Sequence, residues 1–184
     1  MKATLMFAML ASAAVLTGGE VKIDRYEVLP GNYYKHFGTR LDSDLLPVKD
    51  GRTVRKGLLT DGKIRYAPGT GVCYVFWHSK PEDSCVTFSL MLEKPQKITS
   101  IQVFGQNLSS MYTVLKASAE CGEDEIGMEP AGQIAVPEAE RKKRDWQLTI
   151  PCGKKAGILK VTVWTGPDHY LNVTEIKLLG ESES

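Results

Sequence analysis

The sequence predicts an all-β protein that folds as a single antiparallel β-sandwich. Short segments rich in β-branched residues recur through the second half of the chain, and Gly, Pro, Asn and Asp separate them, which is typical of strands joined by turns. Several segments alternate apolar and polar residues with the period of two of a half-buried strand. No segment shows the apolar period of an amphipathic helix, so we expect a core made by strands.

The clearest predicted strand is CVTFSLML, in which one face carries Val86, Phe88, Leu90 and Leu92. In GILKVTVWT one face carries Leu159, Val161 and Val163. Further strands are expected at 97–105, 111–120, 145–152 and 171–180. Trp146 and Trp164 lie in predicted strands, and we expect both in the core. Residues 121–144 form the longest irregular stretch, which we expect to hold a small hairpin or a loop.

The N-terminal residues 1–19 have the layout of a secretory signal peptide. Lys2 precedes an uncharged, mostly apolar run from Ala3 to Leu16, and small residues follow; the run is too short to span a bilayer as a helix. Cleavage after Ala13, Gly18 or Gly19 fits this layout. We therefore expect residues 20–184 to form one sandwich domain that is secreted, periplasmic or at the cell surface, without membrane insertion of the mature chain.

The charge of the chain is nearly balanced, with 23 Lys and Arg against 22 Asp and Glu. Such a balance gives no extended field of one sign to attract nucleic acid or acidic membranes. Two local runs stand out, the acidic ECGEDEIGME and the basic ERKKR. Because both fall between predicted strands, we interpret them as solvated loops with their own charge pairs, with a docking patch as the alternative.

Four cysteines, Cys73, Cys85, Cys121 and Cys152, make disulfides possible in an exported chain. Cys73 and Cys85 flank YVFWHSKPEDS, a predicted hairpin with Pro and acidic residues at its turn. We favour a Cys73–Cys85 pair and, by elimination, a Cys121–Cys152 pair. The other pairings and reduced, buried thiols remain open, since they would leave the same sequence.

An LTDG turn, then VTFSLMLEKPQKITSIQVFG, and finally GILKVTVWTGPDHYLNVTEIKLLG together resemble the galactose-binding-domain-like superfamily. That superfamily includes the discoidin or coagulation-factor type C domains and the family 32 carbohydrate-binding modules. The resemblance covers residues 58–180 and depends on the order and spacing of the motifs. It implies a jelly-roll sandwich whose edge loops bind carbohydrate.

The resemblance also implies a structural calcium ion held by Asp61 of the turn, nearby main-chain carbonyls and Glu175 of the closing strand. Calcium takes six to eight oxygen ligands, which such a loop can supply. Lys63 and Arg65 depart from the acidic or hydroxyl residues that the family often has there. In the alternative, Asp61 caps its own turn, Gly62 supplies a positive φ, and Glu175 pairs with a base.

Sugar binding in the resembling modules uses an aromatic ring that stacks on a pyranose and polar side chains that bond its hydroxyls. Four predicted loops contain such residues: PGNYYKHFG, VFWHSKPED, GQNLSSMY and TGPDHYLN. The candidate ligand-binding residues are Trp77, His78, Asn107, His169, Tyr170, Tyr34 and His36. The alternative for Trp77 is a plug at the sandwich rim, and for His78 a pair with Glu82 or Asp83.

The sequence contains no catalytic motif that we can identify. It has no G-x-S-x-G nucleophile elbow, no paired histidines for a zinc centre and no nucleotide-binding signature. We therefore predict a non-catalytic, lectin-like protein whose partner is a glycan or polysaccharide. The alternative is a module of the same fold that contacts a partner protein through its loops, without binding sugar.

Overall fold

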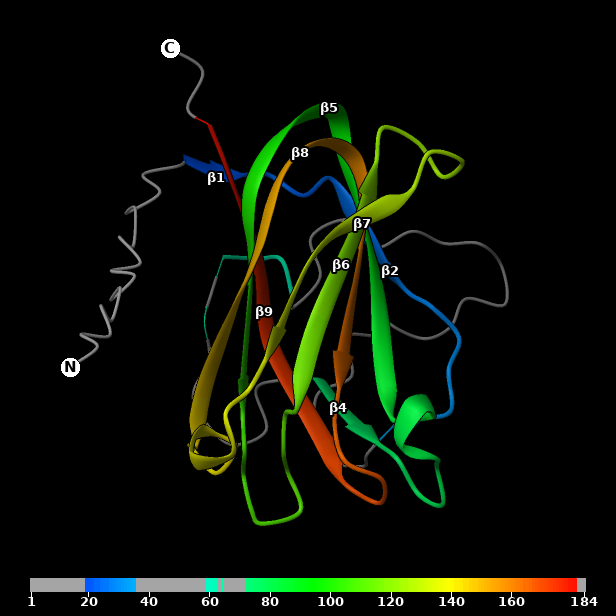
Figure 1. Cartoon of the computed structure of the whole chain (residues 1–184), viewed down its shortest axis with the longest axis vertical. Coiled ribbons are helices and arrows are strands. Elements are labelled where there is room, and N and C mark those ends of the chain that lie inside the picture. The colour runs from blue at the N-terminus through cyan, green and yellow to red at the C-terminus, as the bar shows by residue number, and fades with distance from the viewer. Residues whose placement is uncertain (1–18, 36–58, 63, 65–71, 182–184) are drawn as a thin grey trace, which may run out of the picture.

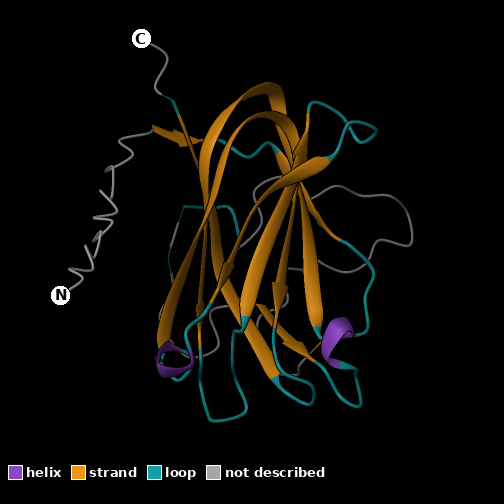
Figure 2. Ribbon diagram, in the orientation of Figure 1, coloured by secondary structure: helices purple, strands orange, loops and turns teal. Residues whose placement is uncertain are grey.

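The computed structural model describes residues 19–35, 59–62, 64 and 72–181. In this part the chain is almost entirely β-structure (Figures 1 and 2), and its only helices are the short 3-10 turns η2 (Pro81–Asp83) and η3 (Glu138–Glu140). The strands are β1 (Gly19–Val21), β2 (Arg25–Val28), β3 (Tyr34–Lys35), β4 (Val72–Val75), β5 (Cys85–Gln106), β6 (Lys116–Gly122), β7 (Glu129–Ala135), β8 (Asp145–Trp164) and β9 (Tyr170–Gly180). The all-β prediction is confirmed.

Two long strands, β5 and β8, join two antiparallel layers. Residues 85–91 of β5 pair with residues 158–164 of β8, while residues 96–106 of β5 pair with residues 145–156 of β8. A register shift between Met91 and Gln96 separates the two halves, and both strands bend together at the top of Figure 1. One layer then has the order β2-β5-β8-β6-β7 and the other β3-β4-β9-β5-β8, which is the predicted sandwich.

The core lies where the period-two pattern places it. The side chains of Phe88, Leu90, Leu159, Val161 and Val163 are fully buried, and Val86 is 1% exposed. Burying these apolar side chains against the facing layer is the main stabilising contribution. Leu92 is only partly buried, because it lies just beyond the point where β5 bends.

The two predicted core tryptophans have different environments. Trp146 is buried, with 6% of its surface exposed, as predicted. Trp164 is not in the core, so that prediction is wrong. It follows the buried Val163 and faces outward on the strand, where Lys116 Nζ lies 4.5 Å from the centre of its ring as a cation–π contact.

The predicted Cys73–Cys85 hairpin is also wrong. β4 pairs with β3 and β9 and not with β5, so the two cysteines do not flank a hairpin. All four cysteines are free thiols in this structure. Cys73 Sγ lies 3.6 Å from Tyr112 Oη, whereas Cys121 Sγ and Cys152 Sγ lie 4.0 Å apart, so the second predicted pair is adjacent without being bonded.

The irregular stretch supplies only the second strand of a hairpin, since β7 pairs antiparallel with β6, most of which lies before residue 121. The predicted signal peptide lies outside the described residues except for Gly19, which begins β1 and pairs with Gly180 of β9. Among the described residues, no helix has the length and apolar character needed to cross a membrane.

Candidate functional site

Four connections meet at one end of the sandwich, at the bottom of Figure 1. They follow β4 (76–84), β5 (107–115), β7 (136–144) and β8 (165–169). Main-chain hydrogen bonds join them: Phe76 N–H donates to His169 O, Asn107 N–H to Arg144 O and Tyr170 N–H to Met111 O. Loops that are far apart in sequence are therefore fixed relative to each other.

The first pocket, which we call the Trp77 pocket, has a volume of about 430 Å³ and is lined by Gly31, Asn32, Tyr33, Trp77, His78, Ser79, Lys80 and Asp83. Trp77 is 54% exposed, while the preceding Phe76 is fully buried. Extended backbone sends successive side chains to opposite sides, so anchoring Phe76 in the core turns the indole outward. An amide, a hydroxyl, an imidazole, an ammonium and a carboxylate lie around this ring.

Tyr33 anchors the pocket to the core. Its ring packs edge-on against Tyr74 and Phe76, with centroids 5.1 and 6.2 Å apart, and its hydroxyl donates to Leu29 O at 2.8 Å. Burial raises the pKa of Tyr33 above its ordinary value, so the hydroxyl is neutral and a donor at physiological pH. The pocket is therefore attached to a rigid aromatic cluster.

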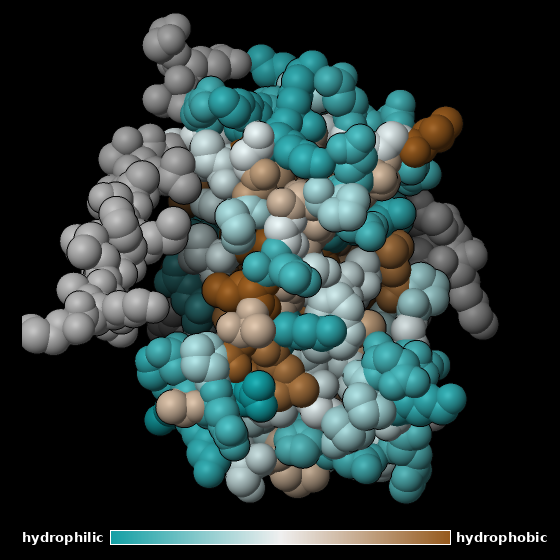
Figure 3. Space-filling model, viewed as in Figure 1, coloured by the Kyte–Doolittle hydropathy of each residue, from teal (hydrophilic) through white to brown (hydrophobic). Residues whose placement is uncertain are grey.

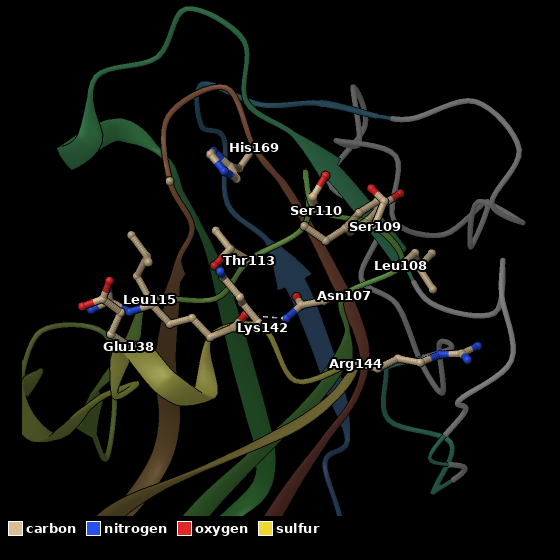
Figure 4. A pocket seen from close by; sticks show the side chains of 13 residues that line it. Asn107, Leu108, Ser109, Ser110, Thr113, Leu115, Glu138, Lys142, Arg144 and His169 are labelled. Atoms are coloured by element: carbon tan, nitrogen blue, oxygen red, sulfur yellow. Dashed lines mark hydrogen bonds between the residues drawn. The ribbon is translucent and has the colours of Figure 1, made fainter.

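The second pocket, which we call the basic pocket, has a volume of about 770 Å³ (Figure 4). Residues of the 107–115 connection form one side, Glu138, Arg141, Lys142 and Arg144 form the other, and Gly166 and His169 close it. Figure 4 shows Asn107, Thr113 and Lys142 close together, while Arg144 extends away from them. This pocket contains the basic run that the sequence analysis interpreted as a solvated loop.

Asn107 has a structural task in the basic pocket. Its Nδ2 donates to Arg141 O and to Lys143 O, each at 2.8 Å, and its main-chain N–H donates to Arg144 O at 2.6 Å. Both hydrogens of the amide group are thus used to hold the basic run. Its predicted role as a direct ligand for sugar hydroxyls is restricted to the amide oxygen.

His169 and Tyr170 occupy different environments although they are neighbours. His169 is half-buried in the wall of the basic pocket, with Nδ1 2.7 Å from Pro167 O. A carbonyl can only accept, so Nδ1 carries the proton and Nε2 of the neutral ring is an acceptor. Tyr170 is half-buried and packs edge-on against Tyr112 with centroids 5.1 Å apart, so it supports the loops from within.

The seven predicted ligand-binding residues therefore do not form one site. Trp77 and His78 line the first pocket, Asn107 and His169 line the second, and Tyr170 packs between strands. Tyr34 lies in β3 opposite Val75, and its side chain is outside the described part, as is all of His36. Glu82 and Asp83 make no contact with His78 among the described side-chain hydrogen bonds; the main-chain N–H of His78 donates to Asp168 instead, at 2.6 Å.

Sequence reasoning did not assign three groups at this end to a pocket, although it singled out the basic run as a solvated loop or a docking patch. Asp168, in a Gly-Pro-Asp turn, joins two connections; Asn32 lines the Trp77 pocket; and the basic run lines the second pocket. The Gly-Pro-Asp turn signal was available for Asp168. The sequence around Asp168 does not indicate that the connection containing His78 lies against this turn.

The LTDG turn and Glu175 do come together. Gly62 N–H donates to Glu175 Oε1 at 3.1 Å, and Ile176 N–H donates to Leu59 O at 2.7 Å. Gly62 has a φ of +80°, as the alternative interpretation of the turn requires. Glu175 is 1% exposed, whereas Asp61 is exposed. Among the described residues, no group of three or more His, Cys, Asp or Glu is placed to hold a metal ion.

The fold of this chain is similar to that of solved family 32 carbohydrate-binding modules. It is similar to a family 32 carbohydrate-binding module from a family 31 glycoside hydrolase of Clostridium perfringens (TM-score 0.54, 13% identity, 88% of this chain and 95% of that one). It is also similar to such a module solved with bound GalNAc (TM-score 0.53, 13% identity, 85% and 97%). A third is the AlyQ module, solved with 4,5-unsaturated mannuronic acid (TM-score 0.51, 10% identity, 88% and 98%).

These likenesses confirm the resemblance in fold that the sequence motifs indicated. Neither a protein-family profile nor a curated protein sequence matches the chain.

Proposed function

We propose that this chain is an extracytoplasmic, non-catalytic carbohydrate-binding protein that holds a glycan in the Trp77 pocket. The exposed indole ring surrounded by polar side chains is the main support. One face of a pyranose is weakly apolar and stacks on an aromatic ring, while its hydroxyls need donors and acceptors at the edge. The pocket offers both, on a fold that other chains use to bind sugars.

The polar surroundings of Trp77 favour sugar over a partner protein. A protein-docking surface is expected to be a contiguous apolar patch, whereas Asn32, His78 and Asp83 lie beside the indole. Figure 3 shows mostly hydrophilic side chains at the lower end of the visible face, where the connections lie. Binding to a partner protein is therefore the alternative function, and the binding experiment described below distinguishes the two.

The proposal of a non-catalytic role rests on the carboxylates of the two pockets. Glycoside hydrolysis generally uses two carboxyl groups on either side of the scissile bond. Asp83 is the acidic side chain that lines the Trp77 pocket, and Glu138 is the one that lines the basic pocket. Neither pocket brings two carboxylates together among the described residues.

We further propose that Asp61 and Glu175 hold a structural calcium ion. Glu175 is almost fully buried, and its Oε1 accepts from the Gly62 N–H of the turn that contains Asp61, so its carboxylate lies beside that turn. Their carboxylates and the carbonyls of the turn are hard oxygen donors of the kind that calcium prefers. The ion would fix the turn to β9.

The test of the sugar proposal is a glycan array probed with the purified protein, in calcium and in chelator. We expect selective binding to a related group of glycans, weakened about tenfold or more in Trp77→Ala. Met111→Ala is the matched control, because Met111 is 45% exposed but does not line the Trp77 pocket. A folded protein that binds no glycan would overturn the proposal and favour the protein-interaction module.

A further inference from the structure

The basic pocket presents more positive charge than its own carboxylate can neutralise. Arg141, Lys142 and Arg144 line it, and Glu138 is the acidic side chain beside them. Lys143, the remaining member of the run, does not line the pocket and pairs with Glu140 at 3.4 Å. Within the described part of the chain, the Lys142 and Arg144 side chains have no hydrogen-bond or ion-pair partner. The local positive charge therefore contrasts with the balanced charge of the whole protein.

The backbone of the basic run is held in place, while the side chains of Lys142, Lys143 and Arg144 are exposed and Lys143 pairs with Glu140, as expected of a solvated loop with its own charge pairs. Asn107 donates three hydrogen bonds to its carbonyls, as described above. Arg141 Nε donates to Val136 O at 3.1 Å, and Arg141 N–H donates to Glu138 O at 3.2 Å. A backbone fixed in this way holds the Cα atoms of its cationic residues in place before a ligand arrives, which reduces the main-chain part of the ordering cost of binding.

The opposite side of the pocket supplies neutral groups suited to sugar hydroxyls. Ser109, Ser110 and Thr113 line it, and Figure 4 shows Ser110 and Thr113 on the side of the pocket nearer His169. His169 Nε2 can accept a hydrogen bond, because Nδ1 is used by Pro167 O. The pocket thus combines unpaired cations with hydroxyls and an acceptor in a volume suited to a saccharide.

We infer that the basic pocket binds an acidic saccharide: Lys142 contacts one carboxylate or sulfate group, Arg144, which extends away from Lys142, contacts another, and the facing hydroxyls and His169 contact neutral hydroxyls. Guanidinium and ammonium groups bind such anions through short, charge-assisted hydrogen bonds. The inference rests on the proposed function, because it takes the chain to be a glycan-binding protein. It adds a second subsite, separated from the Trp77 pocket by the 165–169 connection.

The test compares three oligosaccharides of equal length by titration calorimetry: a neutral galactan, an oligogalacturonate and a galactan carrying sulfate esters. We expect the wild-type protein to bind at least one acidic probe, with an affinity that falls as salt rises from about 0.05 M to about 0.5 M. In the Lys142→Ala/Arg144→Ala variant this affinity should fall about tenfold or more. The two acidic probes distinguish carboxylate from sulfate.

Lys143→Ala is the matched control, because it removes one cation of the same run outside the pocket; it should bind as the wild type does. Equal losses in this variant and in the double variant would show a non-specific charge effect and overturn the inference. Binding of polyglutamate as strong as that of the acidic saccharides would also overturn the inference, because the pocket would then recognise negative charge without the sugar. If the neutral galactan binds through Trp77 and neither acidic probe binds, the inference fails while the proposed function stands; if none of the probes or array glycans binds, both fail.

Discussion

The main-chain N–H of His78 donates a 2.6 Å hydrogen bond to Asp168 Oδ1, and both residues have a φ of 56°. This left-handed conformation is unfavourable for side chains other than Gly, and less so for Asp. The bond connects the β4–β5 connection to the β8–β9 connection, and the nearby Phe76 N–H to His169 O bond strengthens the link. It fixes Trp77, which precedes His78, and His169, which follows Asp168. One contact thus holds residues of both pockets.

Replacing Asp168 with Ala should weaken sugar binding more than it destabilises the fold. The variant loses a charge-assisted hydrogen bond and leaves a Cβ at a positive φ, so we expect a loss of about 1 kcal/mol in the free energy of unfolding. Affinity for a glycan held at Trp77 should fall several-fold, since the loop would no longer be fixed. Asp168→Gly removes the same bond but tolerates the φ, so it should melt higher than Asp168→Ala with the same loss of affinity. Wild-type affinity in both variants, measured by calorimetry, would contradict this role.

Gly105 should not tolerate a side chain. A Cβ at this position would lie 2.0 Å from Trp146 Cζ2 and 2.2 Å from Asn172 O, at a register shift between β5 and β9. Gly105→Ala should therefore lower the free energy of unfolding by about 3 kcal/mol or more, measured by urea denaturation. Gly127→Ala is the control, since the nearest atom to its added Cβ, Asp124 Oδ1, lies 3.6 Å away, an ordinary contact distance. Equal stability of the two variants would show that the sandwich can shift to accept the methyl group.

The layers of this fold could be predicted because successive side chains of a strand point to opposite faces and only one face is buried. Apolar and polar residues therefore alternate along the sequence. Phe88 and Val161 alternate with polar neighbours, and one face of each strand must be covered. The same rule failed at Trp164, because hydrophobicity suggested an inward side chain where the alternation from Val163 points it outward. The alternation of side chains along the strand predicts the orientation of Trp164 correctly, whereas its hydrophobicity does not.

The site could be predicted only in part, because contacts between distant segments form it. Cys73 and Cys85 seemed to flank a local hairpin, but β4 pairs with a strand almost a hundred residues later in the chain. The contact of Asp168 with His78 spans 90 residues, and that of Asn107 with Arg141 spans 34. Sequence spacing identifies residues that favour loops, while the choice of partner depends on the assembled sandwich.

Calcium should raise the melting temperature if Asp61 and Glu175 hold the ion. Binding to the folded state alone stabilises a protein in proportion to the logarithm of ligand concentration, so the wild type should melt higher in calcium than in chelator. Asp61→Ala and Glu175→Gln should remove most of this difference; the second keeps an oxygen that can accept from Gly62 N–H. Glu181→Gln, an exposed carboxylate paired with Lys97 outside this site, is the control. A wild type whose melting is the same in calcium and chelator would exclude the ion.

Cys121 and Cys152 should form a disulfide when an oxidant is supplied, since their sulfurs already lie 4.0 Å apart. Oxidised glutathione would accept two electrons and two protons from the two thiols and leave as two glutathione molecules. The new bond would close a loop of about 30 residues and add about 3–4 kcal/mol to the free energy of unfolding in the chain-entropy account. Mass spectrometry after digestion, with melting before and after oxidation, measures both effects.

The rate of that oxidation should depend steeply on pH. Burial, together with Cys152, raises the pKa of Cys121 to about 11. Because the thiolate is the reacting form, its share at pH 8 is about one in a thousand and rises about tenfold per pH unit below the pKa. Cys121→Ser should abolish the cross-link, while Cys73→Ser should leave it intact, since Cys73 lies against Tyr112. Loss of the cross-link in both variants, or a rate that does not change between pH 7 and pH 9, would show that the adjacent pair does not react in this way.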